Sequence, residues 1–109
     1  MQHFIPPTPR AAEAIISWIT KRGDTEGSFC ALINGVEQEF EARFDVEWER
    51  VGYFKRPDFD EASCTLIGAW AYDENGDVIF AGNRAELVAL IGEVEVSRWE
   101  REQAEREME

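Results

Sequence analysis

The chain has little of what catalysis requires. It contains one histidine, His3, and two cysteines, Cys30 and Cys64. No Ser-His-Asp or Cys-His set can be assembled from a single histidine that lies among prolines, and no group of His and Cys has metal-site spacing. A glycine-rich phosphate-binding loop is also missing. We therefore expect a protein that is not an enzyme and that uses no metal or cofactor.

Positive charge is also scarce. Eleven Lys and Arg residues stand against 23 Asp and Glu residues, which gives a formal net charge of −12. Because phosphate contacts need clustered Lys and Arg, direct binding to DNA, RNA or an anionic membrane surface is disfavoured. A basic partner protein is compatible with this charge.

Long apolar runs are absent, so the sequence predicts no transmembrane segment. Both cysteines lie in short apolar runs, at residues 29–33 and 64–67, with no signal-peptide pattern before them. They are interpreted as buried thiols in a reducing cytoplasm. A length of 109 residues favours one domain with a modest core.

Local signals place the first elements. Prolines before residue 10 predict an extended N-terminal arm over residues 1–8, and Thr8 followed by Pro9 predicts the start of a helix over residues 9–22. A short strand at residues 29–33 then leads into Asn34-Gly35, which favours a type I′ hairpin turn.

An unbroken alternation of side chains follows this turn. One register holds Val36, Gln38, Phe40, Ala42, Phe44, Val46 and Trp48, which are apolar except for Gln38, and the other holds the charged residues Glu37, Glu39, Glu41, Arg43, Asp45, Glu47 and Glu49. Alternation with period two predicts a strand with one apolar and one acidic face. Since the run would span about 50 Å at roughly 3.3 Å per residue, we expect a bend or bulge that lets its two ends pair with different strands.

Two more strands and one or two helices complete the prediction. The strands cover residues 62–72 and 77–81 around a second type I′ candidate, Asn75-Gly76. Asn83 and Glu86 form a capping-box pattern, and Gly92 closes that helix. A last helix is expected from Ser97 to about residue 107, with residues 93–96 as a candidate fifth strand.

The predicted fold class is α+β: an N-terminal helix, a four-stranded antiparallel meander and one or two C-terminal helices packed on one sheet face. We expect two layers, with the acidic face left to water or to a partner. The domain is assigned to residues 9–96, and residues 97–109 form an acidic helix or tail, which Trp99 would anchor, if ordered, to the domain or to a second copy.

The acidic strand face supports two interpretations. Carboxylates at alternate positions are about 6.6 to 6.8 Å apart, whereas one DNA strand carries a charge every ~3.4 Å. A nucleic-acid mimic would therefore need further acids from a neighbouring element. The alternative is a solvated face that discourages aggregation.

The segment over residues 52–60 is expected to be a loop. It gathers Tyr53, Phe54, Lys55, Arg56, Pro57 and Phe59 in an otherwise acidic chain. Aromatic and Arg side chains are common anchors of protein interfaces. The aromatic residues could instead fold back over the sheet edge and complete the core.

Residues 39–49, with the sequence EFEARFDVEWE, precede a Pro-containing loop, a strand pair and an acidic C-terminal helix. Over residues 39–109 this pattern resembles small acidic accessory proteins of bacteriophages and prophages. Size, charge and β-rich build also resemble the acidic phage inhibitors of host nucleic-acid enzymes, including anti-CRISPR, anti-restriction and glycosylase-inhibitor proteins. The resemblance implies a class of function and no particular site residue.

The hypothesis from the sequence is a non-enzymatic, cytoplasmic phage or mobile-element protein that binds a basic surface of a nucleic-acid-handling host protein. Acidic residues would steer association and the loop residues would anchor it. The candidate partner-binding residues are Glu37, Glu39, Glu41, Asp45, Glu47, Glu49, Tyr53, Phe54 and Arg56. The alternatives are an assembly protein that forms homodimers or larger homo-oligomers, and a small enzyme acting on an acidic substrate.

Overall fold

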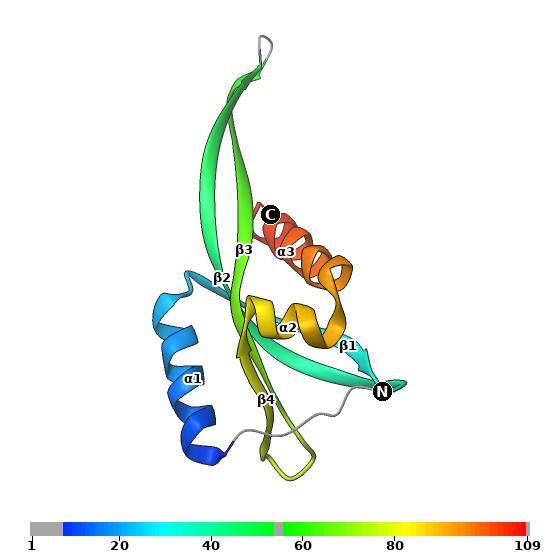
Figure 1. Ribbon diagram of the computed structural model, residues 1–109. Coiled ribbons are helices and arrows are strands. Elements are labelled where there is room, and N and C mark those ends of the chain that lie inside the picture. Colours follow the sequence, from blue (N-terminus) through cyan, green and yellow to red (C-terminus); the bar gives the residue numbers. More distant parts are fainter. Residues whose placement is uncertain (1–7, 54–55, 109) are drawn as a thin grey trace.

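The computed structural model describes residues 8–53 and 56–108 and has the predicted α+β fold (Figure 1). A single antiparallel sheet has the strand order β1-β2-β3-β4. The elements are α1 (Pro9–Arg22), β1 (Thr25–Ile33), β2 (Val36–Tyr53), β3 (Arg56–Tyr72), β4 (Val78–Asn83), α2 (Arg84–Ile91) and α3 (Glu93–Glu107). Among the described residues, no helix is long and apolar enough to cross a membrane.

Helix α1 begins and ends where its sequence signals predict. The Thr8 hydroxyl accepts a hydrogen bond from the Ala11 N–H at 3.3 Å, and Pro9 occupies the first helical position. Gly23 follows the last turn, which contains Lys21 and Arg22. The prediction of a helix over residues 9–22 is confirmed.

The layers differ from the expectation. Helices α2 and α3 cover one face of the sheet, whereas α1 lies on the opposite face (Figure 1). On that face Ala12 and Ile19 pack with Trp70 and Ala81. The expectation of two layers, with all helices on one face, is therefore wrong for α1, because β3 is apolar on both faces here and needs cover on both sides.

The larger core lies between the sheet and α3. Trp99 is fully buried and stacks on Phe29 with a ring-centroid distance of 5.2 Å, and it packs against Phe40 at 5.6 Å. Phe44 meets the edge of Phe29 at 5.7 Å. Since Trp99 lies at the centre of this cluster, α3 is an integral part of the domain and is not a separate tail.

The boundary between α2 and α3 was predicted in part. The capping box of Asn83 and Glu86 is present, and Gly92 ends α2 with a φ of 97°. Helix α3 starts directly afterwards, so the start at Ser97 and the fifth strand at residues 93–96 are wrong. Val96 and Trp99 are both fully buried at helical spacing, and this burial outweighs the short alternation around Val96.

The two hairpin turns have different chemistry. Asn34 and Gly35 have φ values of 53° and 81°, as a type I′ turn requires. In the second turn only Gly76 has a positive φ, and the Asp73 carboxylate accepts hydrogen bonds from the backbone N–H groups of Asn75 and Asp77, both at 2.9 Å. The type I′ prediction is wrong there, because the Asp73 side chain organises a wider loop.

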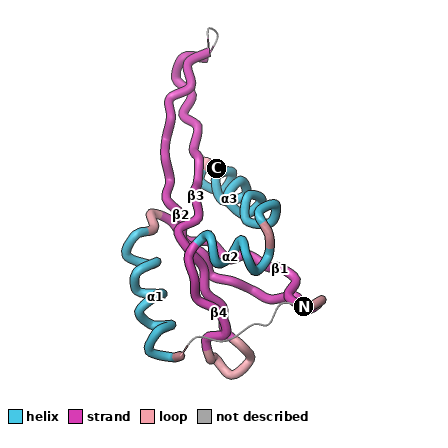
Figure 2. The backbone as a smooth tube through the Cα atoms, in the orientation of Figure 1, coloured by secondary structure: helices cyan, strands magenta, loops and turns pink. Residues whose placement is uncertain are grey.

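Strands β2 and β3 are much longer than their neighbours. Strand β1 pairs with β2 only up to Phe44, and β4 pairs with β3 only up to Gly68, so the remainder forms a two-stranded ribbon that projects from the body (Figures 1 and 2). We call residues 46–53 and 56–64 the hairpin arm. The expected loop over residues 52–60 is therefore wrong, because pairing continues to Tyr53 and Arg56.

The expectation that the two ends of β2 pair with different strands is confirmed, because residues 36–44 pair with β1 and pairing with β3 continues to Tyr53. The expected bulge, however, lies in β3 and not in β2. The register shifts between Arg43, which lies opposite Gly68, and Phe44, which lies opposite Leu66. Ile67 is the extra residue of this bulge. A bulge bends the strand and increases its twist, and here it marks the place where the sheet continues as the hairpin arm.

Candidate functional site

Arg43 divides the acidic row of β2 into two parts. Its guanidinium Nη2 donates hydrogen bonds to the carbonyl oxygens of Thr20 at 3.1 Å and Gly23 at 2.7 Å, and Nη1 lies 3.4 Å from the Glu26 carboxylate. A cation at the end of α1 is favoured by the partial negative charge there. Arg43 therefore holds the last turn of α1 on the sheet, at the point in the row between Glu41 and Asp45.

The first part of the row lies beside β1. Glu37 and Glu39 are exposed, and Glu41 is half-buried and accepts a hydrogen bond from the Ser28 hydroxyl at 3.1 Å. Helix α1 covers the same face farther along, over β3 and β4, and leaves these carboxylates in contact with water.

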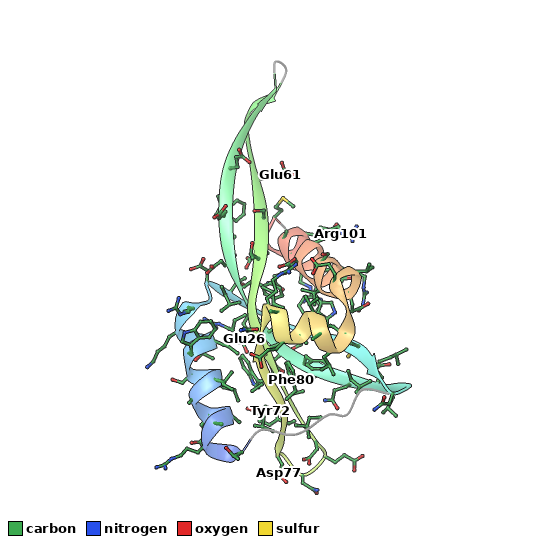
Figure 3. All side chains as sticks on the ribbon, viewed as in Figure 1. Glu26, Glu61, Tyr72, Asp77, Phe80 and Arg101 are labelled. Carbon is green, nitrogen blue, oxygen red and sulfur yellow. The ribbon has the colours of Figure 1, made fainter. Side chains whose placement is uncertain are left out.

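The second part of the row lies on the hairpin arm. Glu47 and Glu49 are exposed, and Glu49 lies directly opposite Glu61, which is exposed as well. Figure 3 shows Glu61 on the ribbon beyond the main body. With the side chains that the structure describes, these three carboxylates make no ion pair or hydrogen bond. We call Glu47, Glu49 and Glu61 the acidic side of the hairpin arm.

The other side of the hairpin arm is apolar near its base. Ala62 and Cys64 are buried there, and burial together with the carboxylates of Glu107 and Glu100 raises the pKa of the Cys64 thiol. Trp48, opposite Ala62, is 56% exposed. The side chains on this side therefore become more exposed from Cys64 to Trp48. The indole of Trp48 is available to a partner.

The remaining predicted binding residues lie nearby. Asp45 is half-buried just before the hairpin arm, and Tyr53 and Arg56 lie opposite each other at its far end, four residues beyond the pair of Glu49 and Glu61. Four residues correspond to about 13 Å. The hairpin arm thus joins the later acids with two of the three predicted anchors, whereas Phe54 lies outside the described residues.

A carboxylate in α3 fixes the base of the hairpin arm. Glu100 Oε2 accepts a hydrogen bond from the Leu66 backbone N–H at 2.7 Å, at the bulge, and from Arg84 Nε at 3.0 Å. Glu100 Oε1 accepts from Arg84 Nη2 at 3.0 Å. The sequence does not predict this role, since its only local signal is a polar residue adjacent to Trp99 in α3.

The two cysteines have different environments. Cys64 is buried, as predicted, but Cys30 is exposed, and the prediction of two buried thiols is wrong for it. Cys30 belongs to the β1 face that carries Ser28, on the side that α1 leaves open. Partial burial and the Glu37 carboxylate raise the pKa of the Cys30 thiol, with a smaller contribution from Glu39. This thiol is therefore less nucleophilic near neutral pH than an ordinary cysteine.

No group of three or more His, Cys, Asp and Glu side chains within the described ranges could hold a metal ion. His3 lies outside those ranges. In comparisons with known proteins, no family model, curated protein or solved structure matches this chain.

Proposed function

We propose that this protein is a non-enzymatic binding protein that uses the acidic side of the hairpin arm to engage a basic surface on another protein. The supporting observation is the direct opposition of Glu49 and Glu61. Like charges at opposed positions weaken an antiparallel pair, and a ribbon of two strands is marginally stable alone. A cationic partner would remove this repulsion and cover the ribbon.

The class of partner follows from its charge. Clustered Lys and Arg are typical of proteins that bind nucleic acids, because they contact phosphates. Glu61 supplies the neighbouring acid that a single row on β2 lacks, so the charge density on the hairpin arm is higher than on one strand. Together with the resemblance to phage inhibitors, this supports an inhibitor that occupies the nucleic-acid-binding surface of a host protein.

Trp48 gives this surface an apolar contact beside its charges. Tryptophan is enriched among residues that dominate binding energy, since it buries a large area at low cost in side-chain entropy. Charge on one side of the hairpin arm and an indole on the other suit a partner that encloses the ribbon within a cleft.

Affinity capture from a bacterial lysate tests this function. The variant Glu47→Gln/Glu49→Gln/Glu61→Gln removes three charges from the hairpin arm, and Glu13→Gln/Glu74→Gln/Glu105→Gln removes three exposed charges elsewhere. We expect the control and the wild type to retain the same basic protein, with affinity that falls as salt rises, and the first variant to lose it. The proposal would be contradicted if both variants retained that protein and their affinities fell equally as salt rises.

A homo-oligomer is the second candidate. The outer edges of the hairpin arm carry backbone groups that no other described strand pairs, and such edges can pair with a second copy. Light scattering at micromolar concentration separates the candidates. A monomer supports the binding protein, and a stable dimer or closed ring supports self-assembly.

A further inference from the structure

The outer edge of β1 is a second candidate surface, separate from the hairpin arm. Strand β1 is the first strand of the sheet, and no described strand pairs with its outer side. In an antiparallel pair, every second residue directs its N–H and C=O away from the neighbouring strand. Natural edges are usually protected by Lys, Pro or a bulge, but the segment TEGSFCALI has neither residue and only one charge, Glu26.

A hollow of about 550 Å³ lies along this edge. Cys30 and Ala31, which line it, are adjacent in β1 and therefore point to opposite faces of the sheet. Lining by both residues places the hollow along this part of β1. Its other lining residues are Leu32, Glu37, Ile91, Glu95 and Arg98. We call this feature the β1 hollow.

The β1 hollow is bordered by a strand edge and by helices. Ile91 at the end of α2 and Arg98 in α3 line it together with Leu32 of β1. A groove between an edge strand and a helix can accommodate an extended peptide, whose backbone pairs with the strand and whose alternate side chains reach the groove. Leu32, which lines the hollow, is 70% exposed, so apolar contact area is available.

The charges around the edge favour a basic occupant. Glu37 and Glu39 are exposed beside Cys30, and their proximity contributes to the raised pKa of that thiol. On the helical wall, Arg98 is already paired with Glu95 and with Glu102, the latter at 3.1 Å, so its charge is neutralised locally. Arg106 lies over the Phe29 ring on the α3 side of β1, at 4.5 Å from its centroid, so the acidic charge beside the edge is that of Glu37 and Glu39 on the opposite face of the sheet.

We propose that the outer edge of β1 binds an extended basic segment of a partner protein, which adds to the sheet as a fifth strand. On the face of Cys30, Lys or Arg side chains of that segment would extend across Cys30 toward Glu37 and Glu39, which lie on β2, about 10 Å from the added strand. Its apolar side chains on the opposite face would enter the β1 hollow near Ile91. A second copy of this chain fits poorly, because two-fold pairing would bring the same acidic side chains and two net charges of −12 together.

The test uses a fluorescent ten-residue peptide that alternates lysine and valine, with blocked ends. We expect it to bind, and to slow amide hydrogen exchange in β1 while leaving exchange in β4 unchanged. An alternating glutamate and valine peptide is the charge control. The lysine peptide with N-methyl groups at alternate residues is the backbone control, and loss of its donors should weaken binding about tenfold or more.

Two substitutions at an exposed position locate the site. Leu32→Lys should weaken binding of the lysine peptide and Leu32→Glu should strengthen it, whereas Ala11→Lys, an equal charge change on α1, should leave the affinity close to that of the wild type. Absence of binding overturns the proposal. Equal binding of the N-methylated peptide, or binding without protection of β1, also overturns it, because contact would then be purely electrostatic.

Dimerisation through β1 without peptide would assign the edge to a second copy and overturn the proposal as well. The triple variant of the hairpin arm should bind the peptide as the wild type does. This proposal and the proposed function can therefore fail separately.

Discussion

At the scale of single residues, Arg43 shows that one side chain can divide a continuous sequence pattern, the acidic row of β2, into two separate surfaces. In the sequence it is an interruption in a row of acids, whereas in the structure it binds the carbonyl oxygens at the end of α1. The acidic row is consequently two surfaces, one beside β1 and one on the hairpin arm. No local signal predicts this, because Thr20 and Gly23 are at least twenty positions away in the chain.

Cys30 provides a pH-dependent test of the negative field at the edge of β1. Partial burial and Glu37 raise its pKa, so less thiolate is present at a given pH than for an ordinary cysteine. Glu37→Gln removes one of these causes, and we expect the pH midpoint of iodoacetamide labelling at Cys30 to move to lower pH. Mass spectrometry of the labelled peptides distinguishes Cys30 from buried Cys64.

The matched control for this test is Glu74→Gln, which removes an exposed charge from the loop between β3 and β4. It should leave the labelling midpoint of Cys30 where it is in the wild type. Equal midpoints for Glu37→Gln and the wild type would show that Glu37 does not act on this thiol.

At the scale of elements, α3 both closes the core and positions the hairpin arm. Glu100 is 14% exposed and accepts hydrogen bonds from the Leu66 N–H and from Arg84. Glu100→Gln replaces a charge-assisted acceptor by a neutral one, and we expect a loss of about 1 to 3 kcal/mol in the free energy of unfolding. Urea denaturation followed by circular dichroism measures it.

Glu105→Gln is the control for Glu100→Gln, since Glu105 is exposed in the same helix. Its effect should stay within about 0.5 kcal/mol, as is usual for surface substitutions. Equal stability of the two variants would show that the charge of Glu100 does not stabilise the bulge at Leu66.

Elements with local signals were predicted well from the sequence. Thr8, Asn34-Gly35 and the pair of Asn83 and Glu86 each act within a few residues of themselves, and the structure has the features that they predict. The start of α3 and the outer part of the hairpin arm, which was expected to be a loop, were not predicted, because burial of Val96 and pairing across the chain decide them. A signal for the hairpin arm was present, since Ala62, Cys64 and Leu66 alternate with polar residues.

At the scale of the molecule, the hairpin arm makes the protein elongated. The radius of gyration is 15.7 Å and the principal extents are 52, 29 and 22 Å, whereas a compact domain of this length has a radius of gyration of about 13 Å. Replacing residues 48–62 by Asn-Gly joins Glu47 to Ser63, which are register partners, through a two-residue turn.

We expect this shortened variant to fold and its radius of gyration to decrease toward about 13 Å, because the core around Trp99 does not include the deleted residues. Small-angle X-ray scattering measures the change, and near-ultraviolet circular dichroism checks the packing of aromatic residues. An unchanged radius of gyration would mean that the ribbon does not project in solution.

The sequence predicted which residues belong to the candidate site, but it did not predict how they are arranged into surfaces. Glu47, Glu49, Tyr53 and Arg56 do share one projecting ribbon, but Glu61 and the free edge of β1 were missed. Both depend on strand register and strand order, and a row of alternating side chains on one strand does not determine its neighbours.

The sequential strand order has a consequence for how the protein folds. Each strand pairs with its neighbour in the chain, so the sheet can form through hairpins with short loops, which favours rapid folding. Closure of the main core is different, because Phe29 and Phe40 obtain their central contact from Trp99, far along the chain. We therefore expect docking of α3 to complete folding, with the hairpins of the sheet forming before it.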